Sequence, residues 1–283
     1  MKNVMGKVGR MGIGAVKYFT LILGAFVSLI PLVTVFITSF KSVKEYNTTG
    51  ALALPENWLN FENYIVAWNK AKMPLAFLNT AIILIFTLIG SIITGTMIAY
   101  VLSRFKFKCN VLIKEAFLLA NLIPGVTMQV STYKIMTALN LVNSIPGIII
   151  LYTGTDIIAI YIFMQFFDSI PYSLDESAIM DGASYITVFF KILFPLLRPA
   201  IVTVMILKGV SVYKEYYMAN LYLQTKTKLV TISTSLYTFT GEYGNQYNYI
   251  CAGVIITIIP VLIVFLFLQK HIYSGMTKGA VKE

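Results

Sequence analysis

The sequence predicts an all-helical polytopic membrane protein with six transmembrane helices. Of 283 residues, 58% are hydrophobic and only 12% are charged, whereas soluble proteins carry about 25% charged residues. Apolar runs of about 20 residues or more, the length needed to cross a bilayer, alternate with short polar segments. The net charge of +10 comes from basic residues beside these runs, as in cytoplasmic anchors, so a nucleic-acid partner is not expected.

The first predicted span covers residues 18–40 and follows a basic N-terminal segment, residues 1–17. This apolar run is too long for the core of a signal peptide and lacks a small-residue cleavage pattern. We therefore expect an uncleaved span with a cytoplasmic N-terminus. Residues 41–74 are polar, contain two tryptophans and are predicted to form an ordered external loop.

The next three predicted spans cover residues 75–102, 111–136 and 145–167. The turn between the second and third spans contains Arg104, Lys106 and Lys108. This positive charge predicts that the turn lies in the cytoplasm. Pro124 predicts a kink within the third span. Counting spans then places residues 171–195 in the cytoplasm, although that loop has few basic residues of its own.

The last two predicted spans cover residues 196–217 and 249–268, with a long external loop between them. They complete a transmembrane domain over residues 18–270. Residues 271–283 are expected to form a cytoplasmic tail.

The loop over residues 171–195 is polar at its start and predicts two short helices. Ser173 and Glu176 have the spacing of a capping box, so a helix is expected from Leu174. Gly182 supplies a residue that tolerates a left-handed stop, and Ser184 can cap a second helix that runs to Pro195. The product is a compact knob, and an amphipathic connector with ordinary caps is the alternative interpretation.

The same loop resembles the EAA signature of ABC importer permeases, E-A-A-x-x-x-G-x(9)-I-x-L-P, including the D-G-A of sugar importers. The matching residues are Glu176, Ala178, Asp181, Gly182, Ala183, Ile192 and Pro195. Ser177 stands where the family usually has alanine, and Phe194 where it has leucine.

This resemblance implies a type I ABC importer permease fold with a cytoplasmic coupling helix that docks into a cleft on a separate ATPase subunit. The residues that it assigns to coupling are Leu174, Asp175, Glu176, Ser177, Ala178, Asp181, Gly182, Ala183, Ile192 and Pro195.

A second resemblance lies in the tail, where residues 269–282 are similar to the C-terminus of the six-span permease of maltose-type importers. It implies that Gly275, Lys278 and Gly279 contact the ATPase; a solvated basic tail is the alternative. Gly241 to Gly244 and several upstream motifs also fall in family order. The segment Tyr213 to Tyr216 departs from the family's Trp-Asn-(Asp/Glu)-Phe, which leaves the substrate open.

Asp156 and Lys208 are predicted to lie near the middle of their spans. A rise of 1.5 Å per residue places Asp156 roughly 16 Å from the outer end of the fourth span and Lys208 roughly 18 Å from the cytoplasmic end of the fifth. Because a charge facing lipid costs about 2.5 to 3.5 kcal/mol on insertion scales, both should turn inward. We expect them to face the translocation pathway with Tyr213 and Glu215 nearer its outer rim; mutual pairing of Asp156 and Lys208 is the alternative.

Motifs for catalysis or nucleotide binding are missing from the sequence. It contains no G-x-x-x-x-G-K-(S/T), H-E-x-x-H or G-x-S-x-G pattern. Cys109, Cys251 and the single histidine, His271, are isolated and suggest no metal site. We therefore expect a subunit without catalytic activity, cofactor or metal, whose transport uses ATP and Mg²⁺ held by partner subunits.

The expected function is that of a permease subunit of a carbohydrate importer in the bacterial inner membrane. The partners implied by the resemblance are a second permease, two ATPase subunits, an extracytoplasmic sugar-binding protein and membrane lipids. An ion-coupled secondary transporter is the alternative, but it predicts more spans and inverted repeats. A membrane-embedded enzyme would need a catalytic cluster that the sequence does not show.

Overall fold

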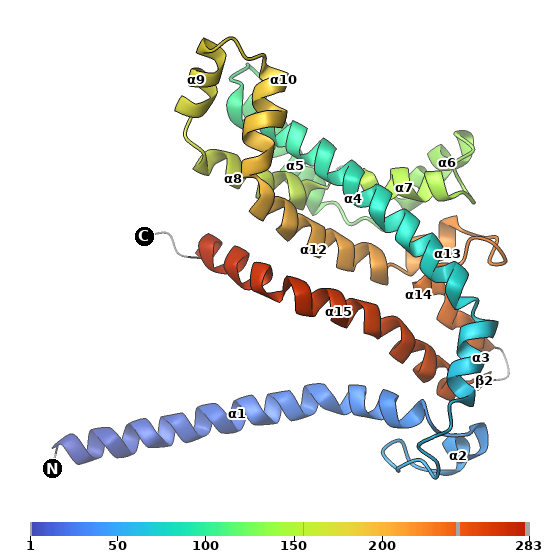
Figure 1. Ribbon diagram of the computed structural model, residues 1–283. Helices are drawn as coiled ribbons and strands as arrows, with labels where there is room; N and C mark the ends of the chain where they lie inside the picture. The colour runs from blue at the N-terminus through green and yellow to red at the C-terminus, as the bar shows by residue number, and fades with distance from the viewer. Residues whose placement is uncertain (1, 155, 242–243, 281–283) are drawn as a thin grey trace. The chain divides into compact units, whose positions relative to one another are not determined.

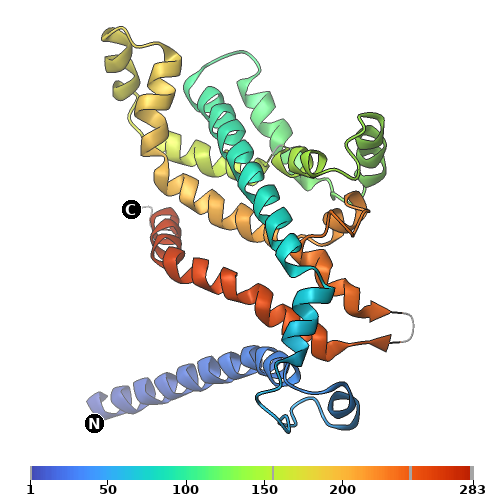
Figure 2. The ribbon, with the colours of Figure 1, turned by 45° about the vertical axis from the view of Figure 1, so that its right-hand side comes forward.

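The computed structural model describes residues 2–154, 156–241 and 244–280, without the side chains of residues 2–13, 15, 244, 268 and 270–280. The chain forms two compact units (Figures 1 and 2). The first contains residues 1–72 and 236–261, and the second contains residues 73–235 and 262–283.

Elements of the first unit are α1 (Lys2–Thr38), α2 (Val43–Thr48), α3 (Glu62–Lys70), the 3₁₀ turn η2 (Leu236–Phe239), β1 (Thr240–Gly241), β2 (Gly244–Asn245) and the start of α15 (Tyr247–Ala280). The two short strands pair antiparallel. Buried Asn63 joins three segments of this unit: its amide donates to the carbonyls of Ser39 and Lys41 at 2.8 Å, and its oxygen accepts from Asn248 at 2.9 Å. The predicted loop over residues 41–74 is therefore ordered, as expected.

The second unit contains the remaining elements: α4 (Met73–Arg104), α5 (Asn110–Leu122), α6 (Gln129–Ala138), α7 (Ile145–Thr153), α8 (Ile157–Ser169), α9 (Ser173–Met180), α10 (Tyr185–Thr187), the π-helix η1 (Val188–Leu193), α11 (Phe194–Leu196), α12 (Arg198–Lys214), α13 (Tyr217–Tyr222) and α14 (Ile232–Ser235). Helix α4 runs unbroken alongside α7, α8 and α12.

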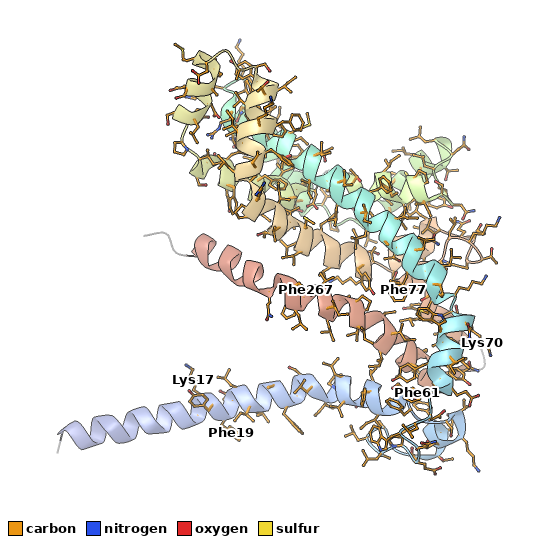
Figure 3. The ribbon with its side chains drawn as sticks, viewed as in Figure 1. Lys17, Phe19, Phe61, Lys70, Phe77 and Phe267 are labelled. Carbon is orange, nitrogen blue, oxygen red and sulfur yellow. The ribbon has the colours of Figure 1, made fainter. Side chains whose placement is uncertain are left out.

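Among the described residues, three helical stretches are long and apolar enough to cross a membrane: Val16–Thr38, Met73–Arg104 and Tyr247–Phe267. Two bent pairs would raise this number to five, namely Ile145–Thr153 with Ile157–Ser169, at 47°, and Tyr185–Leu196 with Arg198–Lys214, at 72°. Phe19 on α1 and Phe267 on α15 are exposed (Figure 3), as expected for helices that face lipid or a partner's spans. The total of six spans stays a prediction.

Two predicted spans are not continuous helices. The range 111–136 consists of α5 and α6, because Pro124 forces Ile123 into an extended conformation, with φ −77° and ψ 120°. The helix therefore ends where only a kink was expected. The range 145–167 breaks between α7 and α8, and Asp156 lies at this break, as the N-cap of α8.

Glycines on α4 allow the broken helices α7 and α8 to pack closely. A β-carbon at Gly90 would lie 2.6 Å from Cγ2 of Thr153, and one at Gly95 would lie 3.2 Å from the ring of Phe163. The largest buried apolar cluster of this unit continues from these contacts and includes Ala99 on α4 and Ile160 and Phe163 on α8. The close approach of α4 thus depends on residues without side chains.

We expect Gly90→Ala to destabilise the second unit, because the added methyl group overlaps the short, branched side chain of Thr153. Overpacking of this kind costs about 1 to 3 kcal/mol. The double variant Gly90→Ala/Thr153→Ala should recover most of the loss. Thermal unfolding in detergent measures the stability of the single and the double variant. Gly209→Ala is the control, because the structure has space for its added β-carbon. Equal unfolding temperatures for Gly90→Ala and the wild type would contradict the close contact.

Candidate coupling and translocation sites

Helix α9 ends in a complete Schellman motif that turns the chain into α10. The amide of Gly182 donates to the carbonyl of Ile179, and the amide of Ala183 donates to that of Ala178, both at 2.9 Å. Gly182 has φ +84°, a left-handed conformation that glycine adopts without strain. Ser184 then caps α10 by accepting from the amide of Thr187 at 3.2 Å. The predicted glycine bend and second cap are therefore confirmed.

The predicted capping box at the start of this helix is wrong. Ser173 is the first residue of α9, and the N-cap is Tyr172, which makes no side-chain cap hydrogen bond. Tyr172 has helical dihedral angles, φ −60° and ψ −27°, so the hydroxyl of Ser173 lies inside the first turn and not before it. The Tyr172 hydroxyl donates to the carbonyl of Ser103 at 2.5 Å, which holds the helix start in place.

The residues assigned to coupling divide into an exposed and a buried set. Leu174, Glu176, Ser177, Asp181, Gly182 and Pro195 are exposed, Ala183 and Ile192 are partly buried, and Asp175 and Ala178 are buried. Ala178 belongs to the same buried cluster as Val188 and Phe189. At the tip, Met180 is 86% exposed and Ile186 is also exposed. Both helices of the knob thus carry an exposed apolar side chain.

Arg104, at the end of α4, contacts the knob through several groups. Its Nε lies 2.8 Å from Oδ2 of Asp175, and these side chains are only 4% and 11% exposed. The Arg104 Nη2 donates to the carbonyl of Ile170 at 2.9 Å, and the guanidinium lies 4.3 Å from the ring centre of Tyr172. The Nε–H group is not aligned for a hydrogen bond with the carboxylate, so the contact is an ion pair.

The sequence interpretation assigned Arg104 only to charge placement and missed this contact. The sequence offered one signal: Arg104 ends the second predicted span, and Asp175 lies in a loop predicted on the same side of the membrane. Nothing in the spacing of the two residues identifies them as partners.

Asp156 and Lys208 form an ion pair, with Oδ2 and Nζ 3.1 Å apart and side chains 18% and 17% exposed. The alternative that they pair with each other is therefore confirmed. Asp156 also caps α8, because its Oδ1 accepts from the amide of Ala159 at 3.2 Å. Their exposure to the translocation pathway stays a prediction.

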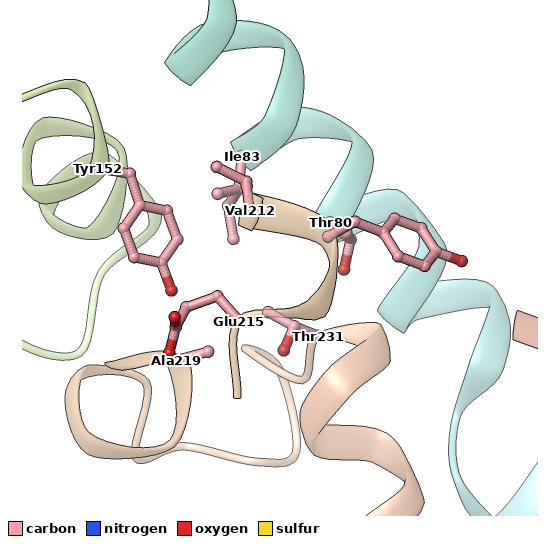
Figure 4. Close-up of a pocket in the computed structure, with 8 residues that line it drawn as sticks. Thr80, Ile83, Tyr152, Val212, Glu215, Ala219 and Thr231 are labelled. Atoms are coloured by element: carbon pink, nitrogen blue, oxygen red, sulfur yellow. The ribbon is translucent and has the colours of Figure 1, made fainter. Parts of the chain in front are cut away.

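Tyr213 and Glu215 line a small cavity of about 10 Å³ (Figure 4), whose described lining is Thr80, Ile83, Tyr152, Val212, Tyr213, Glu215, Ala219 and Thr231. The Tyr152 hydroxyl points toward the Glu215 carboxylate and has no hydrogen-bond partner among the described residues. The space holds about one water molecule. Asp156 and Lys208 are not in this lining, so the four predicted pathway residues form two separate groups.

The tail residues Gly275, Lys278 and Gly279 lie in the last turns of α15. Their side chains lie outside the described residues, as do residues 242 and 243 of the Gly241 to Gly244 motif.

A family model described as binding-protein-dependent transport system inner membrane component matches residues 3–278. The chain belongs to this family. It is 31% identical over 255 residues to the melibiose/raffinose/stachyose import permease protein MelC of Bacillus subtilis, covering 89% of this chain and 91% of MelC. It is 29% identical over 270 residues to the diacetylchitobiose uptake system permease protein NgcG of Streptomyces coelicolor, covering 95% and 89%.

The fold is also that of a solved importer. The chain matches a bacterial ABC transporter involved in the import of the acidic polysaccharide alginate with a TM-score of 0.80, 22% identity and coverage of 91% of this chain and 95% of that one. The EAA motif is typical of the family. The chain is thus a non-catalytic transmembrane permease component of the bacterial inner membrane.

Proposed function

We propose that this chain is a permease subunit of an ATP-driven, binding-protein-dependent carbohydrate importer, with an oligosaccharide as substrate. MelC and NgcG, which match most of the chain, are permeases for such sugars by name. The observation that carries the proposal is the knob formed by α9, the Gly182 bend and α10, which presents an exposed apolar tip. Because the chain has no phosphate-binding motif, ATP must bind another subunit. The movement of that subunit can reach this chain only through a contact surface such as the knob.

The proposed assembly pairs this chain with a second permease, two ATPase subunits and an extracytoplasmic sugar-binding protein. ATP and Mg²⁺ are held by the ATPases. The six spans and cytoplasmic termini expected from the sequence would put the knob on the ATPase side of the membrane. Closure of the ATPases would then move the knob and switch the spans between inward-open and outward-open states, as a rigid-body transition.

The broken helix α7–α8, with a charged residue at the break, is also typical of ion-coupled secondary transporters. That alternative is weaker because the family match extends over residues 3–278. It still predicts a different energy source.

Uptake by a reconstituted complex tests the proposal. The chain is co-expressed with its proposed partners: the second permease, the ATPase subunits and the binding protein. The purified complex is placed in vesicles with radiolabelled raffinose, melibiose or diacetylchitobiose. We expect the ATPase to co-purify and uptake to require ATP and the binding protein. Uptake driven by an ion gradient without ATP, or purification of the chain without any ATPase, would contradict it.

We expect removal of residues 277–283 to lower the amount of ATPase retained by the complex or to change its rate of hydrolysis, because the tail resemblance implies contact with the ATPase dimer. A full-length Lys282→Gln chain is the control for loss of a terminal charge alone. ATPase retention is measured by quantitative gel analysis and hydrolysis by phosphate release. Unchanged values for the truncated chain would leave the tail as a solvated end.

A further inference from the structure

We infer that Arg104 is a positioning residue that fixes the knob to α4, and that α4 transmits knob movement to the loop between α12 and α14 at its opposite end. This inference rests on the proposed function, since it assumes an ATPase that moves the knob. It adds a route by which the movement crosses the membrane.

The first step is the attachment at the end of α4. Besides its link to η1 through Ala178, α9 is attached to α4 by the guanidinium of Arg104. That group reaches the carboxylate of Asp175 inside α9, the carbonyl of Ile170 before α9, and the ring of Tyr172 at its N-cap. Three contacts from one planar group restrict both translation and rotation of α9 relative to α4.

The second step is electrostatic. Burial raises the pKa of Asp175 above its usual range, the Arg104 guanidinium opposes this rise, and the nearby Glu176 adds to it. Neither carboxylate oxygen of Asp175 accepts a hydrogen bond within the part of the chain that the structure describes. The guanidinium is therefore the group that stabilises the buried carboxylate, and separation of the two is unfavourable.

The third step is the attachment at the other end of α4. The amide of Asn79 donates to the carbonyls of Lys228 and Val230 at 2.9 and 2.8 Å, and the Thr80 hydroxyl accepts from the amide of Ile232 at 3.0 Å. These bonds, of which the last two are buried, hold the segment that leads into α14. Between Thr80 and Arg104 the helix is unbroken, a length of roughly 36 Å.

Helices α7–α8 and α10–α12 are bent, so a force applied to them can be absorbed at the bend. Among the described helices of the second unit, α4 runs the full distance without a break. It is therefore the element that can carry a displacement from the knob to the opposite loop.

ATP-dependent labelling of a cysteine at the far end tests this inference without knowledge of the sugar. Cys109 and Cys251 are replaced by serine, and Tyr217→Cys, at an exposed position of α13, is labelled with a water-soluble maleimide in the assembled complex. Trapping with ATP and vanadate should change the labelling rate by at least about fivefold, the lower range of measured allosteric coupling. Arg104→Gln should abolish this change while ATP hydrolysis continues, and Asp175→Asn should abolish it as well.

Arg104→Lys, which keeps the charge but loses the planar contacts, should retain part of the response. Lys106→Gln and Asp168→Asn remove exposed charges from the same regions and should leave it intact. A normal response in Asp175→Asn would overturn the inference. Failure of Asp175→Asn to bind the ATPase, while Asp168→Asn still binds it, would also overturn the inference. The pair of Arg104 and Asp175 would then act in docking of the ATPase. Failure of the unmodified complex to bind an ATPase would instead contradict the proposed function.

Discussion

Replacing Gly182 with valine is expected to abolish ATP-driven transport while the chain still inserts into the membrane. Gly182 has φ +84°, and a β-branched residue in this region carries strain on the order of 1 to 3 kcal/mol. The bend can relieve this strain only by giving up the Schellman bonds to Ile179 and Ala178, which reorients α10 relative to α9. We expect hydrolysis stimulated by the binding protein to fall at least about tenfold, since 1.4 kcal/mol corresponds to that factor.

The set of substitutions at position 182 separates strain from lack of space. No atom lies within 4 Å of a β-carbon built on Gly182, so the chain itself has room for a side chain. Asparagine tolerates the left-handed region better than alanine, and alanine better than valine. Activity should therefore fall in that order, measured as phosphate release in proteoliposomes. Full activity of Gly182→Val would remove the role of the bend; equal loss with all three residues would indicate a steric clash with the ATPase instead.

Lys208→Met is expected to destabilise the fold strongly, because it leaves the carboxylate of Asp156 without its partner 3.1 Å away. Loss of one member of a fully buried ion pair costs about 3 to 5 kcal/mol, and the cost here should be smaller because the two side chains are 18% and 17% exposed. Asp156 cannot turn away easily, since it also caps α8. The melting temperature of the purified chain in detergent should fall, and less folded protein should be recovered.

The double variant Asp156→Asn/Lys208→Met is the matched control, because it removes both charges and keeps a side-chain oxygen for the cap. Its stability should approach that of the wild type, and the two single variants with the double one form a complete thermodynamic cycle. An unchanged melting temperature for Lys208→Met would show that the pair is solvated and contributes little.

Cysteine labelling checks whether this pair also faces the pathway. In the proposed importer, Lys208→Cys or Asp156→Cys should react with a water-soluble thiol reagent, more slowly when the transported sugar is present. Absence of labelling in every ATP state would restrict the pair to a structural role.

The sequence by itself determined the features that depend on local chemistry. Apolar runs predicted the helices α1, α4 and α15 because a bilayer requires about 20 apolar residues whatever their neighbours are. Gly182 and Ser184 predicted the bend and the second cap correctly, since backbone conformation and capping are decided within a few residues. The EAA spacing predicted the family for the same reason, because its residues lie within one loop.

Only the tertiary structure decided which distant groups meet. The start of α9 was mispredicted: the helix begins at Ser173, one residue earlier than expected, and the hydroxyl of its N-cap residue Tyr172 bonds to Ser103 in another helix. The pairs Arg104 with Asp175 and Lys208 with Asp156 join residues far apart in sequence. A charge in an apolar run shows that a partner is needed, because its burial is costly. The choice of partner depends on how α4, α8, α9 and α12 pack, and hydrophobic periodicity does not encode that packing.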